Sequence, residues 1–282
     1  MGCLTEPTGQ FLTVGKTRLH YRQVGTGPDL VALHGASGNL RDWDMGQLDR
    51  LAKRWRVTLF DRPGAGFTTR APGMHNPHRQ AALLRAALTP LGVKNPVLLG
   101  HSFGGTVALA WALDAPDTVK GLCLMAAPSH PWPGTVGRLY EIGDLPWIGA
   151  LVAWAYPRLA SDRLIDQSIR NVFHPDQPPQ NYRRGLCAEL ATRYATVRAN
   201  IADINRLKPY IIRMAERYGG LALPVEILHG DHDGTVPLDI HSRRLAPVLP
   251  NGRLQVLENT GHMPHHSRQD DMFAALERLR EA

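Results

Sequence analysis

The stretch NPVLLGHSFGGTVALAWAL, residues 95–113, changes its hydrophobic pattern in the middle. Its first part, Pro96 to Leu99, is a short continuous apolar run, which is typical of a strand buried on both faces. Its last part, Thr106 to Leu113, is rich in Ala and Leu and predicts a helix. Ser102 therefore lies on a tight turn between a strand and a helix.

The neighbours of Ser102 are small. A turn from strand to helix within one or two residues forces an unusual backbone on the residue at its apex, and Gly100 and Gly104 leave room for it. The serine hydroxyl would then project beside the first helical amides, which have no intrahelical acceptor. The pattern G-x-S-x-G in this setting indicates a nucleophilic serine. A glycine-rich connection in an ordinary α/β protein is the alternative.

The composition is that of an ordinary globular chain. Its 282 residues, 43% hydrophobic and 20% charged, suffice for one large α/β domain with an insertion or for two modest domains. The net charge is +7, but the arginines are scattered without an aromatic-basic stripe, so no nucleic-acid partner is expected. The most apolar stretch, Leu145 to Tyr156, is too short to span a bilayer and contains Gly149, so no membrane span is expected.

The N-terminal sequence MGCLTEPTGQ has neither the basic nor the apolar region of a secretory signal, and Glu6 breaks the myristoylation pattern. The three cysteines, Cys3, Cys123 and Cys187, are too few for a disulfide framework and lack metal-type spacing. We therefore expect a cytoplasmic protein in a reducing compartment.

Strand-like and helix-like segments alternate along most of the chain. Strands are expected at 17–23, 30–34, 57–61, 96–99, 119–125, 225–229 and 253–257, and helices at 40–51, 106–113, 238–248 and 270–280. Such alternation predicts an α/β fold with a mainly parallel central sheet, helices on both faces and binding groups at the carboxyl ends of the strands. Because the alternation stops in the middle, we expect a core at 1–128, an inserted helical cap at 129–220 and the rest of the core at 221–282.

A serine is a weak nucleophile at neutral pH, so Ser102 needs a base, and the base needs an orienting carboxylate. The loops after the last two expected strands offer both. GDHDGTVP at residues 230–237 contains two aspartates, and ENTGHMP at residues 258–264 contains a histidine. The chain order is then serine, acid, histidine.

The sequence resembles the α/β-hydrolase fold superfamily, and within it the capped serine hydrolases of the esterase and lipase kind. The matching segments are HGASG at 34–38, DRPGAG at 61–66, GHSFGG at 100–105, HGDHDGTVP at 229–237 and TGH at 260–262. The resemblance runs over nearly the whole core, from about Thr17 to Leu279. For the insertion it implies only that a helical cap usually occupies that place.

The resemblance implies a Ser-His-Asp triad, with Ser102 as nucleophile, Asp233 as acid and His262 as base. Asp231 is the rival acid. The family pattern G-x-x-D-x-x-V-P over residues 230–237 favours Asp233, and Asp231 is then a turn residue.

An oxyanion hole needs two backbone donors, and the resemblance implies the amides of Phe103 and Ala36. His34 is expected to brace the loop that carries Ala36. Residues 61–66 are expected to form a structural turn near the site.

Three further histidines lie close to the predicted triad residues in the sequence. His101 adjoins Ser102, and we interpret it as a packing or polar support. His265 and His266 follow His262 and are expected to belong to the approach to the last helix.

The reaction implied by the resemblance is hydrolysis of small to medium lipophilic carboxylic esters through an acyl-enzyme, without metal or organic cofactor. The same triad serves C–C bond hydrolysis of a diketone-like compound, lactone hydrolysis and perhydrolase or haloperoxidase chemistry, and these alternatives stay open. A hydrolase-like small-molecule receptor is the non-catalytic alternative. A homodimer also stays open.

Trp147, Leu151 and Trp154 are expected on one face of a helix, at positions i, i+4 and i+7. They pack the cap on the core, or they form the wall of an apolar acyl or aryl pocket.

Overall fold

The computed structural model describes residues 6–282, apart from the side chains of Arg138, Leu139 and Pro146. Its strands are β1 (Gln10–Val14), β2 (Thr17–Val24), β3 (Asp29–Leu33), β4 (Arg56–Phe60), β5 (Val97–His101), β6 (Gly121–Met125), β7 (Val225–Gly230) and β8 (Gly252–Leu257). They form one sheet in the order β1-β2-β4-β3-β5-β6-β7-β8, in which β1 and β2 are antiparallel to their neighbours and the strands from β4 to β8 are parallel. The predicted fold class is confirmed.

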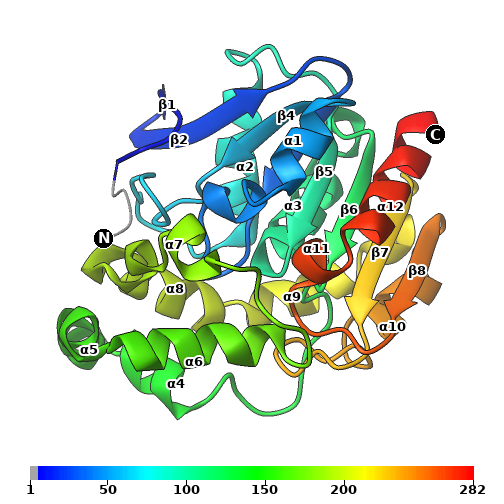
Figure 1. Ribbon diagram of the computed structural model, residues 1–282. Helices are drawn as coiled ribbons and strands as arrows, with labels where there is room; N and C mark the ends of the chain where they lie inside the picture. Colours follow the sequence, from blue (N-terminus) through cyan, green and yellow to red (C-terminus); the bar gives the residue numbers. More distant parts are fainter. Residues whose placement is uncertain (1–5) are drawn as a thin grey trace.

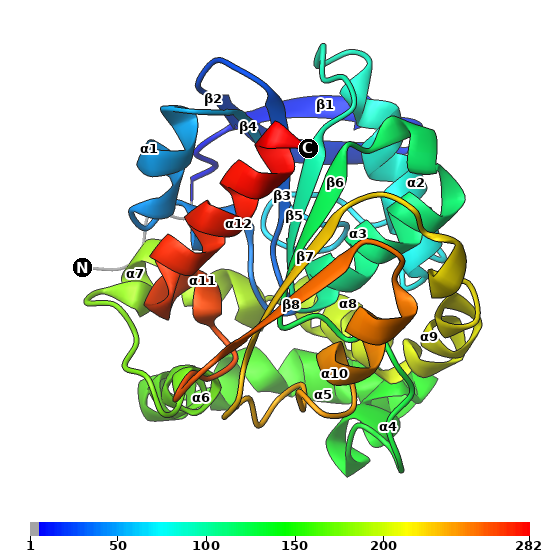
Figure 2. The same cartoon turned by 90° about the vertical axis from the view of Figure 1, so that its right-hand side faces the viewer.

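The α-helices are α1 (Gln47–Ala52), α2 (Pro77–Leu88), α3 (Phe103–Asp114), α4 (Arg138–Asp144), α5 (Pro146–Leu159), α6 (Asp162–Phe173), α7 (Tyr182–Leu186), α8 (Tyr194–Asn205), α9 (Lys208–Ala215), α10 (Ser242–Leu245), α11 (Pro264–Ser267) and α12 (Gln269–Glu281). Helices α1 and α12 cover one face of the sheet, and α2 and α3 cover the other (Figure 2). The central strands therefore alternate between two cores. In β3, Leu30 and Ala32 belong to the first, and Val31 and Leu33 to the second.

Two expected elements change, and elements that were not expected appear. The helix expected at 40–51 divides into a 3₁₀ turn, η1 (Leu40–Trp43), and α1, because Gly46 adopts a left-handed backbone with φ 95° between them. The helix expected at 238–248 shortens to α10 and a following 3₁₀ turn that contains Pro247. Strand β1 was not expected, because it is a short edge strand; among the described strands it pairs with β2 alone. Helix α2 was not expected either.

The helices between β6 and β7 lie across the carboxyl ends of the parallel strands (Figure 1). Asn39, in the loop after β3, donates to the Leu186 carbonyl at 2.8 Å, and the His262 amide, after β8, donates to the Val172 carbonyl at 3.2 Å. Helix α9 packs instead into the core that contains α3, through Ile211. The boundaries 129 and 220 of the cap remain a prediction.

None of the helices at residues 6–282 combines the length and the apolar character that crossing a bilayer requires.

Cys187, after α7, is disulfide-bonded. The cysteines therefore do not support the expected reducing compartment, and the cytoplasmic location stays a prediction.

Candidate active site

Ser102 lies at the junction of β5 and α3 with φ 50° and ψ −124°, a conformation that few residues other than glycine adopt. The junction is tight enough to exclude side chains on both sides of it. A Cβ atom at Gly104 would lie 2.2 Å from the Leu33 carbonyl oxygen, and one at Gly100 would lie 2.6 Å from the Cα of Gly105. The two glycines are therefore required by the close approach of α3 to the sheet.

The structure brings Ser102, His262 and Asp233 into one chain of hydrogen bonds. Ser102 Oγ lies 3.0 Å from His262 Nε2, and His262 Nδ1 lies 2.7 Å from Asp233 Oδ2. The three residues follow β5, β8 and β7, whose carboxyl ends meet at one edge of the sheet. All three are buried. This geometry allows His262 to take the serine proton while the carboxylate orients the imidazole.

Asp233 is held as a carboxylate by its surroundings. Its Oδ1 accepts hydrogen bonds from the Thr235 and Val236 amides, both at 2.8 Å, and its Oδ2 lies 3.2 Å from His229 Nε2. Burial alone would raise the pKa of Asp233, but a positive charge on His262 and hydrogen bonds from His229 and His262 together hold it well below its usual value. Asp233 thus remains a negatively charged acceptor for His262.

The rival acid, Asp231, points elsewhere. Its Oδ1 lies 2.7 Å from Nδ1 of His232 and accepts from the Thr260 amide at 3.2 Å. Its side chain is about one-third exposed. The loop after β7 thus presents Asp233, not Asp231, to His262.

Of the two amides expected to form an oxyanion hole, that of Ala36 lies in the loop after β3 and that of Phe103 at the start of α3, and these two segments contact each other. A Cβ atom at Gly35 would lie 3.1 Å from the Cβ of Ser102, so the loop that carries Ala36 packs directly on the serine. Within the described part of the chain, neither the Ala36 amide nor the Phe103 amide donates a hydrogen bond. Both donors are therefore free for a ligand.

Arg62 holds the loop that carries Ala36 through hydrogen bonds to His34 and Gly35. Its backbone amide donates to His34 Nε2 at 3.0 Å, its Nε donates to the His34 carbonyl at 2.9 Å, and its NH2 donates to the Gly35 carbonyl at 3.0 Å. Burial, followed by the charge of Arg62, lowers the pKa of His34 to about 4. His34 is therefore neutral, accepts at Nε2 and donates from Nδ1 to the Gly35 carbonyl at 2.7 Å.

Arg62 also forms an ion pair with α8, one of the helices between β6 and β7. Its NH1 lies 3.1 Å from Oδ2 of Asp203 in α8, and Arg70 NH2 lies 2.6 Å from Oδ1 of the same carboxylate. Asp203 and Arg62 are both almost fully buried. The position of α8 is thus coupled to the loop of Ala36 by a buried ion pair.

Comparison with known proteins identifies the family. A model of the alpha/beta hydrolase fold matches residues 28–269. The chain belongs to this family. It is 29% identical over 274 residues to a pimeloyl-(acyl-carrier protein) methyl ester esterase of Vibrio parahaemolyticus, covering 92% of this chain and 96% of that one. It is 30% identical over 266 residues to a 2-hydroxymuconate semialdehyde hydrolase of Pseudomonas putida, covering 90% of this chain and 86% of that one.

The fold is shared with solved structures at low identity. An esterase from Exiguobacterium antarcticum superimposes with a TM-score of 0.78 at 18% identity, covering 97% of this chain and 100% of that chain. This likeness shows the α/β-hydrolase fold alone.

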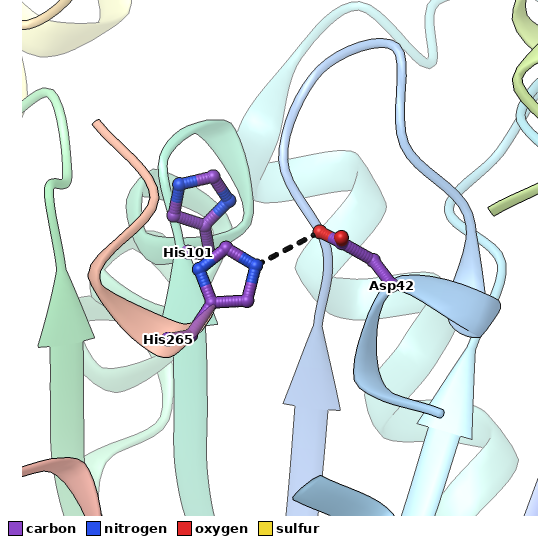
Figure 3. A group of neighbouring side chains, drawn as sticks. All are labelled: Asp42, His101 and His265. Atoms are coloured by element: carbon purple, nitrogen blue, oxygen red, sulfur yellow. Dashed lines mark hydrogen bonds and ion pairs between the residues drawn. The ribbon is translucent and has the colours of Figure 1, made fainter. Parts of the chain in front are cut away.

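Next to His262 in this α/β-hydrolase family member lies a buried cluster formed by Asp42 of η1, His101 and His265 (Figure 3). His101 Nε2 donates to the carbonyl of His262 at 2.8 Å, so His101 holds the backbone of that histidine. The rings of His101 and His265 have their centroids 4.1 Å apart. His265 Nε2 lies 3.0 Å from Asp42 Oδ2. The expected support role of His101 thus has a partner in His262.

Asp42 gathers several donors in this cluster. Besides His265, it is contacted by His266 Nε2 at 2.9 Å and by the Tyr182 hydroxyl at 2.9 Å. Burial alone would raise the pKa of Asp42, but the charge of His265 and the hydrogen bonds of both histidines hold it well below its usual value. His265 and His266 lie on the short helix α11 that leads to α12.

Within residues 6–282, Asp42, His101 and His265 are the one group of side chains with metal-type donor atoms close together, all within 4.8 Å of one another. Both Asp42 oxygens and the Nε2 atoms of the two histidines already make hydrogen bonds, whereas the buried Nδ1 atoms of His101 and His265 make none with the described residues. We therefore interpret the group as a support for His262.

These buried imidazoles predict a loss of stability in mild acid. Burial, as the largest cause, lowers the pKa of both His34 and His265 to about 4, whereas histidines of the unfolded chain titrate near about 6.5. Between these values the unfolded chain binds more protons, so the free energy of unfolding decreases as the pH falls from about 6.5 to about 4. We expect Tm, followed by circular dichroism, to fall across this window.

A variant tests the assignment. In His265→Gln, the new side chain keeps an amide donor for Asp42 but takes up no proton. The free energy of unfolding of this variant should therefore decrease less steeply with falling pH than that of the wild type, by about 1.4 kcal/mol per pH unit for one fully buried imidazole. Equal slopes for the wild type and the variant over this window would contradict the prediction, whatever the absolute Tm of either protein.

The three apolar residues of the expected pocket or packing face are placed on the surface. Trp147, Leu151 and Trp154 of α5 are 88%, 62% and 54% exposed, so they line no enclosed pocket and do not pack on the core. A cavity of about 450 Å³ lies instead beside the loop of Asp233, between α6 and His232. Its lining is mostly polar, and Ser102 is not part of it.

Three supporting residues were not found from the sequence: Asp42, Arg62 and Asp203. Arg62 lies in the family segment DRPGAG, where only a structural turn was expected. Asp42 and Asp203 carry no local signal, because their partners are more than a hundred residues away in the chain.

Proposed function

We propose that this protein is a serine hydrolase that cleaves carboxylic esters of small to medium lipophilic substrates through an acyl-enzyme. The observation that supports it is the chain of hydrogen bonds from Ser102 through His262 to Asp233, at 3.0 Å and 2.7 Å. The preference for esters is supported by the similarity to a methyl ester esterase over 96% of that protein's length.

In the first half of the reaction, Ser102 Oγ attacks the ester carbonyl carbon while His262 Nε2 accepts its proton. The carbonyl π electrons move onto oxygen, and the free amides of Ala36 and Phe103 stabilise that oxyanion. The oxyanion then collapses, the bond between carbonyl carbon and ester oxygen breaks, and His262 returns the proton to the leaving alkoxide. Asp233 stabilises the imidazolium throughout without becoming protonated.

In the second half, water attacks the carbonyl of the acyl-serine, and His262 now removes a proton from the water. A second tetrahedral oxyanion forms at the same two amides. Its collapse expels the Ser102 oxygen, which takes the proton back from His262, and releases the carboxylic acid. Every proton in the cycle passes through Nε2 of His262.

A second candidate function is hydrolysis of a C–C bond next to a ketone. The similarity to a 2-hydroxymuconate semialdehyde hydrolase, 30% identical over 266 residues, favours it. The same serine attack applies, but the leaving group is a carbon that must take a proton.

The two functions are separated by one panel of substrates. The full-length protein is assayed with p-nitrophenyl esters, from acetate to a long-chain acid, and with a 2-hydroxy-6-oxo-dienoate, whose cleavage is followed by loss of its visible absorbance. The proposal predicts that kcat/KM for the best ester exceeds kcat/KM for the 2-hydroxy-6-oxo-dienoate by at least about a hundredfold. If the 2-hydroxy-6-oxo-dienoate is cleaved more efficiently than every ester, the function is C–C bond hydrolysis and not ester hydrolysis. If the folded protein turns over neither class of substrate, a ligand-binding role is favoured.

A further inference from the structure

Exposed apolar side chains gather on one part of this protein. Nine of the twelve large apolar side chains that are exposed in the described part of the chain lie between residues 142 and 164. Trp147, Leu151 and Trp154 form a continuous strip along α5, since residues at i, i+4 and i+7 share one helix face. The opposite face of α5 packs on α8 through the buried Ala153. The strip is therefore held outward by a packed helix.

The only charge on α5 itself is positive. Residues 145–161 contain no Asp or Glu. Arg158 follows Trp154 by one turn, its guanidinium lies 4.3 Å from the centre of the Trp154 ring, and its NH1 donates to the Trp154 carbonyl at 2.6 Å; it forms no ion pair with any residue that the structure describes. The flanking acids, Asp144 and Asp162, are each paired with an arginine. Helix α5 thus carries an apolar strip that ends in a cation and no acidic residue, and among the described residues nearby Glu141 of α4 is the acid without an ion pair.

We propose that α5 docks this protein on the surface of an anionic lipid membrane. Tryptophan is suited to the boundary between headgroups and acyl chains because its ring is large and amphipathic. An arginine at the end of such a strip extends its guanidinium to the lipid phosphates while its stem stays in apolar surroundings. The net charge of +7 adds long-range attraction to a negative surface.

The position of the strip suits a flat surface. In both ribbon views, α4, α5 and α6 lie along the outer side of the molecule, beyond the carboxyl edge of the sheet, and no other element lies outside them (Figures 1 and 2). Two such strips packed about a two-fold axis would bring together two Arg158 cations and two chains of net charge +7, with no acid on α5 to pair them. An anionic surface meets the same strip with opposite charge.

Docking in this orientation has a consequence for the substrate. The helices that meet the lipid are those that cover the edge where Ser102 lies, so esters dissolved in the membrane would be presented to that edge. This consequence rests on the proposed function, whereas docking itself does not.

Sedimentation with vesicles tests the proposal. The full-length protein is mixed with vesicles of phosphatidylcholine alone, or of phosphatidylcholine with roughly a third phosphatidylglycerol. Trp147→Gln combined with Trp154→Gln should weaken binding to the anionic vesicles at least about tenfold. The matched control replaces two exposed apolar residues outside the strip, Ile212→Gln with Val248→Gln, and should change binding less than about twofold.

Arg158→Gln should weaken binding to the anionic vesicles only, and added salt should do the same to the wild type. Because the replaced side chains are exposed, far-ultraviolet circular dichroism should be unchanged. Sedimentation measures binding without turnover, so a failure of the proposed ester hydrolysis leaves this result readable.

Three outcomes would overturn the proposal: no binding of the wild type to either vesicle, equal binding of the wild type and the double Trp variant, or a wild-type dimer in sedimentation velocity that becomes a monomer in that variant. The last outcome would assign the strip to a second copy of the chain.

Discussion

Ser102→Ala lowers kcat for the preferred p-nitrophenyl ester by about 10⁴- to 10⁶-fold, because the variant has no nucleophile to form an acyl-enzyme and retains only the help of the oxyanion donors and of binding. Alanine occupies the same space without the hydroxyl, and the φ of 50° is no more strained for Ala than for Ser. We therefore expect a folded protein with an unchanged circular dichroism spectrum. The measurement is steady-state kinetics on both proteins at one pH.

A second serine provides a matched control. Ser129 is fully buried and its Oγ lies 3.2 Å from Nδ1 of His130, so it forms another serine–histidine contact. It lies outside the chain of hydrogen bonds that ends in Asp233, and Ser129→Ala should change kcat less than about twofold. A phosphonate ester that labels nucleophilic serines should add its mass to the peptide that contains Ser102 and to no other. Retained activity in Ser102→Ala would refute the serine mechanism.

Asp233→Asn has the second largest expected effect, a loss of about 10⁴-fold in kcat. An amide donates as well as accepts, so it permits the tautomer of His262 in which Nε2 carries the proton and cannot act as the base. It also removes the charge that stabilises the imidazolium. The side chain keeps its size, and its oxygen can still accept from the Thr235 and Val236 amides. KM should change far less than kcat.

The control is the same substitution two residues earlier. Asp231 is partly exposed and bonds His232, so Asp231→Asn should lower kcat less than about threefold. Comparing the loss of kcat in the two variants shows which aspartate of the loop after β7 acts on His262. A larger loss in Asp231→Asn than in Asp233→Asn would exchange their roles.

Much of the fold could be predicted because its signals are local. The buried strands appear as continuous apolar runs, and the turn at Ser102 appears in its two flanking glycines. Where local signals compete, prediction was less accurate: the helix expected at 40–51 is interrupted at Gly46, and β1 is too short to stand out. The strands that hold the candidate site were all expected, with ends shifted by one or two residues.

The supports of the candidate site could not be predicted in the same way. Asp42 contacts His265 and His266 across more than 220 residues of sequence, and Arg62 meets Asp203 across 141. Pairs of this kind depend on how the loops at the carboxyl edge of the sheet are stacked. No periodicity along the chain records that stacking.

The sequence by itself determined the α/β fold, the turn that presents Ser102 and the segments that carry the acid and the histidine, because each depends on residues close together in the chain. It also determined that Trp147, Leu151 and Trp154 share a helix face. Only the tertiary structure decided which aspartate contacts His262, which buried groups hold His34 and His101, and that the face of α5 is turned to solvent. A helix period relates side chains to one another, whereas burial is set by whatever packs against them.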